Sequence, residues 1–138
     1  MLKKILITTA LSVTCAASAL TSGADLMKAP PGDGYKKVSE LVKLPDFVLG
    51  LGQLYVKPET LPAGPFLAYD KKGKLVSSVY MIPIKDIEDH KKFDDLATGP
   101  KKVDHVDLYY NAGHPGVEAP HYHFILWYIP EKEADMLK

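Results

Sequence analysis

Apolar and polar residues alternate along two short segments near the C-terminus, residues 103–110 and 121–128. Successive side chains of a β-strand point to opposite faces of the sheet, so this two-residue period predicts two strands. Residues 111–120 can reverse the chain between them, which favours an antiparallel hairpin. We expect burial of one continuous apolar face to fix the register of this hairpin. That face comprises Val106, Leu108, Phe124 and Leu126.

The pattern upstream also indicates strands. Three runs rich in apolar and β-branched residues predict them, at 47–56, 66–69 and 74–82. The second and third runs flank a turn that starts with Asp70 and ends with Gly73, so they should form a hairpin. Gly50 and Gly52 interrupt the first run and predict a bulge or a close approach of two backbones. The proline-rich stretch 57–65 between the first two runs reads as a loop.

Helical periodicity is confined to two stretches. Residues 36–44 place Val38, Leu41 and Val42 on one side and end at Pro45. Residues 85–97 carry scattered apolar positions among charges and end at Gly99-Pro100, which predicts an amphipathic helix. The chain is therefore expected to be mainly β (α+β), one compact domain with an antiparallel sheet or small barrel and two or three short helices.

The first residues have the order of a signal peptide. A basic start at residues 1–4 precedes an apolar run and the small-residue site Ala17-Ser18-Ala19. We expect removal of residues 1–19, or alternatively 1–24, and a periplasmic or secreted protein with no transmembrane segment in the mature chain. Residues 25–46 would form a lead-in with a short helix, and residues 47–138 the β-rich domain.

Composition narrows the possible partners. All 17 basic residues are lysine, so the chain has no guanidinium group that could form bidentate hydrogen bonds with bases or phosphates. Nucleic acid is therefore not an expected partner. Cys15 is the single cysteine and lies within the signal segment, so the mature chain offers no thiolate or disulfide. A metal would be bound by imidazole and carboxylate groups, which suits zinc, copper(II), nickel or iron.

The two C-terminal strands carry most of the candidate chemistry. His105 and Asp107 share a face of the first strand, and His121 and His123 share a face of the second. The pairing register that brings the apolar faces of the two strands together also places these four side chains on one face of the sheet. There they could bind a divalent metal or a small ligand. In the connecting loop, His114 is a further possible ligand and Glu118 a possible base or hydrogen-bonding carboxylate. The competing hypothesis is a purely structural polar cluster. The remaining histidine, His90, is expected to be a solvated helix residue.

Three functions are compatible with this pattern. The leading hypothesis is an exported, non-enzymatic protein that binds a divalent metal or small ligand through the His/Asp cluster. The first alternative is a cupin-like metal-dependent enzyme, because Pro120-His121-Tyr122-His123 is similar to a cupin metal strand, although the downstream glutamate of that motif is missing. The spacing of His105 and Asp107 also occurs in iron and 2-oxoglutarate oxygenases, which usually need an arginine that this chain lacks. The second alternative is an envelope interaction protein without a ligand.

Several segments resemble a family of small secreted bacterial proteins of unknown function, found in Thermus among others. The resemblance spans residues 50–128 and rests on four segments: 51–65, 77–83, 103–105 and 120–124. Gly113-His114 and Pro120-His121 match the family, whereas His121-Tyr122-His123 stands where members carry a His-x-Asp-x-His stretch. The resemblance implies an exported β-rich domain and no established activity.

Intact-mass analysis checks the predicted export signal. The exported protein should lack residues 1–19, or residues 1–24, because the basic start, apolar run and small-residue site occur in the order that signal peptidase requires. A mature mass that still includes Met1 would contradict the prediction.

Overall fold

The computed structural model describes residues 26–137. The predicted signal segment and its cleavage site lie outside these residues. In the part of the chain that is described, no helix has the length and apolar content needed to cross a membrane.

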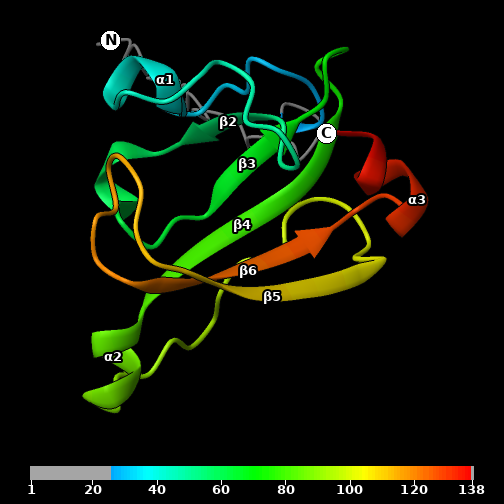
Figure 1. Ribbon diagram of the computed structural model, residues 1–138. Helices are drawn as coiled ribbons and strands as arrows, with labels where there is room; N and C mark the ends of the chain where they lie inside the picture. The colour runs from blue at the N-terminus through cyan, green and yellow to red at the C-terminus, as the bar shows by residue number, and fades with distance from the viewer. Residues whose placement is uncertain (1–25, 138) are drawn as a thin grey trace, which may run out of the picture.

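One six-stranded antiparallel sheet organises the domain (Figure 1). Its strands are β1 Lys36–Lys37, β2 Gln53–Val56, β3 Phe66–Tyr69, β4 Leu75–Pro83, β5 His105–Asn111 and β6 His121–Trp127. They are ordered β1-β2-β3-β4-β6-β5, so β1 and β5 are the edges of an open sheet. The predicted mainly β domain is confirmed, in its sheet form and not as a barrel.

The helices are shorter than the sequence pattern predicts. They are α1 Val38–Leu41, α2 Ile84–Glu88 and α3 Glu131–Ala134, with 3-10 turns at Pro58–Thr60 and Asp135–Leu137. The predicted helix over residues 85–97 is wrong beyond Glu88, because His90 adopts a positive φ of 58° and ends the helical path. Two tyrosine hydroxyls bind carbonyls of the segment that follows α2. Tyr80 of β4 donates to Ala97 O at 2.8 Å, and Tyr128, directly after β6, donates to Thr98 O.

The predicted hairpin of β3 and β4 is confirmed. Asp70 Oδ1 accepts the backbone N–H groups of Lys72 at 2.8 Å and Lys74 at 2.9 Å, which closes the turn between the two strands. The expected close approach of backbones is also present at Gly52. A Cβ at Gly52 would overlap the carbonyl oxygen of Tyr69, and the residue has a φ of +113°. The strand predicted over 47–56 therefore begins only at Gln53.

The hydrophobic core lies mainly on one face of the sheet. It contains residues from β2, β3, β4 and β6 together with side chains from the segments on either side of the strands: Val38, Leu51, Leu54, Val56, Phe66, Ala68, Val76, Val79, Met81, Val117, Ile125, Trp127, Ile129 and Leu137. A smaller cluster of Tyr55, Leu67, Tyr69, Leu75 and Tyr128 forms a second buried group. The larger core determines which face of β6 is buried.

The predicted pairing of the two histidine-bearing strands is confirmed. β5 and β6 are antiparallel, with His105 opposite Trp127 and Asn111 opposite His121. This parity puts His105, Asp107, His121 and His123 on one face.

The expectation of which face is buried requires correction. His121 and His123 are 0% and 3% exposed, whereas Val106 and Leu108 are 54% and 55% exposed. The reason lies in β6, which is paired on its other side with β4. There His123 lies opposite Met81, so the histidine face continues the main core.

Replacing Gly52 by alanine tests the close backbone approach. Gly52→Ala should lower the free energy of unfolding by about 3 kcal/mol, because it combines left-handed backbone strain with a clash against backbone atoms. Gly50→Ala is the matched control: Gly50 has a φ of +81° and open space where a Cβ would lie, so only about 1 kcal/mol is expected. Urea unfolding followed by the fluorescence of Trp127 measures both. Equal losses in the two variants would contradict the assignment.

Candidate metal centre

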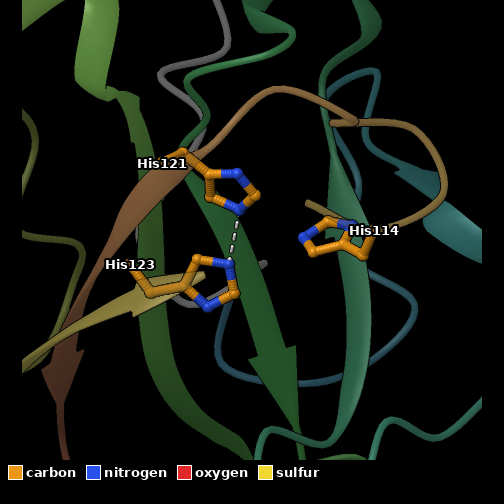
Figure 2. Close-up of side chains that lie close together, drawn as sticks. All are labelled: His114, His121 and His123. Atoms are coloured by element: carbon orange, nitrogen blue, oxygen red, sulfur yellow. Dashed lines mark hydrogen bonds between the residues drawn. The ribbon is translucent and has the colours of Figure 1, made fainter. Parts of the chain in front are cut away.

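Two buried histidines face each other at the start of β6. His121 and His123 are separated by one residue, so both project from the core face of the strand. Their Nε2 atoms lie 2.9 Å apart (Figure 2). Since β6 is hydrogen-bonded on both sides, by β4 and by β5, the backbone positions from which the two rings project are held relative to each other.

A third histidine reaches the pair from the loop before β6. His114 and Val117 exchange backbone hydrogen bonds of 3.0 Å each, which forms a tight reverse turn. Gly113 allows this turn to pack, because a Cβ there would overlap the carbonyl oxygen of Glu118. The ring centroid of His114 is 4.9 Å from that of His121 and 5.6 Å from that of His123. Figure 2 shows the His114 ring turned toward the other two.

The three rings together form a set of potential metal ligands. One ring nitrogen from each of His114, His121 and His123 lies within 4.8 Å of the others. Two imidazole nitrogens bound to one tetrahedral zinc ion at about 2.1 Å would be about 3.4 Å apart. The 2.9 Å between Nε2 of His121 and Nε2 of His123 is slightly shorter than this value. The 4.8 Å range within which the three ring nitrogens lie is somewhat longer. Small rotations of the rings would bring all three nitrogens to coordinating distance.

Backbone carbonyls assign the protons on two of the rings. His121 Nδ1 lies 2.7 Å from Ala119 O, and His114 Nδ1 lies 3.1 Å from Pro115 O. A carbonyl oxygen can only accept, so each Nδ1 carries a proton and each Nε2 presents a lone pair. Metal-binding histidines usually have such a partner on the second nitrogen, because it orients the ring and strengthens the donor.

The third ring is held by a tyrosine. His123 Nδ1 lies 3.1 Å from Tyr109 Oη on β5, and its Nε2 faces the lone pair of His121. Without a metal, the consistent arrangement is a chain in which Tyr109 donates to His123 Nδ1 and His123 Nε2–H donates to His121 Nε2. Coordination through His123 Nε2 would move that proton to Nδ1, which would then donate to Tyr109 Oη.

The surroundings keep His123 uncharged. Burial, reinforced by the neighbouring His121 and His114, lowers the pKa of His123 to about 4. The ring is therefore neutral at pH 7, in the form that binds metals.

An open-sided cavity of about 310 Å³ adjoins the cluster. Its polar wall is formed by His114, His123, Tyr109 and Asn111. Its remaining wall is apolar and comprises Leu44, Val48, Leu49, Gly50, Leu51, Leu54 and Met81. His121 is fully buried and does not line the cavity. A metal among the three rings would adjoin the cavity through His114 and His123.

The pairing register places His105 and Asp107 away from this cluster. His105 lies opposite Trp127, four residues from His123, which corresponds to about 13 Å along a strand. His105 Nδ1 lies 2.8 Å from Asp104 Oδ1, and the ring stacks on Trp127 with centroids 6.0 Å apart. Asp107 Oδ2 accepts a hydrogen bond of 2.8 Å from the indole N–H of Trp127. These two candidate ligands therefore contact a core tryptophan and do not join the other three.

Two residues of the site, Tyr109 and Asn111, are not among the candidates that the sequence pattern indicates. Both continue the two-residue spacing of His105 and Asp107 and lie opposite His123 and His121 in the register. That alternation was the signal that could have identified them.

A solved structure is similar to this chain. The crystal structure of hypothetical protein TTHB210 from Thermus thermophilus matches with a TM-score of 0.62 and 43% sequence identity. The match covers 68% of this chain and 92% of the Thermus protein. No protein-family model and no curated protein matches the sequence.

The lowered pKa of His123 predicts how stability depends on pH. In metal-free protein the free energy of unfolding should fall as the pH drops from about 6.5 to about 4, because the unfolded chain takes up a proton that native His123 resists. The full contribution, about 3 kcal/mol, should be present above pH 6.5. His123→Gln should remove this part of the pH dependence. Urea unfolding at several pH values in chelator measures it.

The exposed His90 gives the matched control for this measurement. His90→Gln should keep the pH dependence of the parent protein, since its ring is solvated in both states. Parallel curves for the parent and His123→Gln would contradict the assignment.

Proposed function

The chain belongs to the family of the hypothetical protein TTHB210 of Thermus thermophilus. We propose that it is an exported protein that binds a divalent metal ion through His114, His121 and His123. The observation that supports the proposal most strongly is the meeting of three imidazole nitrogens within 4.8 Å beside the hydrophobic core. His114 and His121 would keep their Nδ1–H bonds to backbone carbonyls while Nε2 coordinates the metal, so within the cluster only the hydrogen bond between His121 and His123 would be given up.

The donor set narrows the choice of metal. Three imidazole nitrogens and no thiolate suit zinc, copper(II), nickel or iron. Zinc fits best, since three histidines with a fourth position left for another ligand is a common zinc arrangement. The backbone carbonyls of Ala119 and Pro115 hold two rings in the tautomer that leaves Nε2 free to coordinate zinc.

A metal-dependent enzyme is the second candidate, and the cavity is the observation that favours it. A metal with three protein ligands and one open side could activate a water molecule. Among the described residues that line the cavity, however, none is an aspartate or glutamate that could act as a general base. We therefore favour binding over catalysis.

Export is supported by the sequence alone. The basic start, apolar run and Ala-x-Ala site of the first 19 residues are the features on which it rests. Nitrogen-only coordination suits an oxidising compartment, because it uses no thiol that could be oxidised.

Metal binding should raise the melting temperature. Zinc in hundredfold excess over its dissociation constant would stabilise the native state by about 2.7 kcal/mol, which a thermal melt resolves. His114→Ala, His121→Ala and His123→Ala should each weaken zinc binding at least tenfold in isothermal titration calorimetry at pH 7.5. The half-buried His114 is the safest of the three to replace, because its ring is not part of the core.

His105→Ala and His90→Ala serve as controls. His105 lies on the same sheet face but at the far end of β5, and His90 is exposed at the end of α2. Both variants should bind zinc as the parent does. If zinc, copper(II) and nickel all fail to bind the parent, or if His105→Ala loses binding while His114→Ala retains it, the proposed site is wrong.

A further inference from the structure

The charge of the metal centre would be unbalanced. Three neutral imidazoles contribute no negative charge, so a divalent ion bound to them would keep its full positive charge. Within the described range, the residues that line the adjoining cavity include no carboxylate either. A dication beside an apolar wall is stabilised by an anionic ligand in its open coordination position.

The cavity has two chemically different walls. Its polar wall consists of Tyr109 and Asn111 from β5, with His123 from β6 and His114 from the reverse turn. Most of the apolar lining comes from the segment between α1 and β2, which contributes Leu44, Val48, Leu49 and Leu51. A ligand that fits both walls has a charged head for the metal and a hydrocarbon body for the leucines.

We propose that this cavity binds a small organic monocarboxylate, whose carboxylate oxygen coordinates the metal and whose short hydrocarbon body contacts Leu44, Val48 and Leu49. The inference rests on the metal site proposed above. A volume of about 310 Å³ is at the lower end of ligand cavities, which suits a short chain and not a lipid or an oligosaccharide. A sugar is disfavoured also because the leucine wall offers no hydrogen-bonding side chains.

Tyr109 links metal binding to carboxylate binding. When His123 coordinates through Nε2, its Nδ1–H donates to Tyr109 Oη and the tyrosine proton becomes available to another acceptor. Since Tyr109 lines the cavity beside His114 and His123, its proton would be donated to the carboxylate oxygen that does not coordinate the metal. Tyr109 is thus a positioning residue that donates to the ligand in the metal-bound protein.

Cobalt(II)-loaded protein provides a direct test, because the visible spectrum of cobalt changes when its coordination changes. Titration with acetate, butyrate and hexanoate at constant ionic strength should give saturable changes, with affinity rising about fourfold for each methylene that enters the cavity. Hexylamine should give no change, because its charge is repelled by the metal, and metal-free protein should bind none of the acids. Inorganic phosphate has no hydrocarbon body, so its affinity should not depend in a comparable way on the leucines that line the cavity.

Two matched variants separate the cavity from general charge effects. Leu49 lines the cavity and is 74% exposed, so Leu49→Asp should fold and should weaken hexanoate at least tenfold while cobalt still binds. Leu96→Asp adds the same charge at an exposed leucine outside the cavity lining and should bind hexanoate as the parent does. Tyr109→Phe should retain cobalt and lower the affinity for every carboxylate by a similar factor, because the hydroxyl of Tyr109 donates to the carboxylate group that all of them share.

The outcomes distinguish this inference from the metal proposal. Absence of a cobalt spectrum in the parent protein would overturn both. A cobalt spectrum that no carboxylate changes would overturn the ligand inference alone. Equal affinity for acetate and hexanoate, unaffected by Leu49→Asp, would show an anion on the metal with no use of the apolar wall, and would also overturn it.

Discussion

The pairing of β6 with strands on both sides is the feature that holds the site together. β4 and β5 hydrogen-bond to opposite edges of β6, so His123 lies opposite Met81 on one side and Tyr109 on the other. A slip of one residue would turn His121 and His123 outward and bury their neighbours. Because both ladders would have to slip together, the two rings stay on the core face. His114 can therefore complete the group by means of a short turn.

Burial of these polar rings is tolerated because each buried nitrogen has a partner. The hydrogen bonds run from Tyr109 through His123 and His121 to the carbonyl of Ala119, with distances of 3.1, 2.9 and 2.7 Å. The same hydrogen-bond chain holds Nε2 of His121 and Nε2 of His123 2.9 Å apart. One ring nitrogen of each of these two residues and of His114 lies within 4.8 Å of the others. A site of this kind can be kept intact without metal and still coordinate one with a single proton shift at His123.

The sequence pattern predicted the strands and their shared face, but not where along the face the ligands lie. Alternation reports the side of the sheet on which a residue projects and says nothing of its position along the strand. His105 and His123 therefore have the same parity, yet the register separates them by four residues. The register depends on the hairpin loop, whose turn at His114 required the packing of Gly113 against Glu118.

Two other differences between the sequence prediction and the structure, the buried face of β6 and the helix over residues 85–97, also arise from contacts between distant segments. The sequence pattern marked the face of β6 with Phe124 and Leu126 as the apolar one, but pairing with β4 puts the opposite face, with Ile125 and Trp127, into the core. The helix expected over 85–97 gave way to tertiary hydrogen bonds from Tyr80 and Tyr128, which no local pattern reveals. The turn of β3 and β4 and the close approach at Gly52 were predictable, because each depends on the chemistry of one or two adjacent residues.

Anomalous diffraction at the zinc edge, from crystals of the protein grown with zinc, would locate the bound metal without assumptions about its ligands. We expect one strong peak among His114, His121 and His123, with three ring nitrogens at about 2.0 to 2.1 Å and a fourth ligand on the cavity side. A peak at His105 with Asp104 or Asp107, or zinc only at surface carboxylates with the three rings unchanged, would contradict the proposed metal centre.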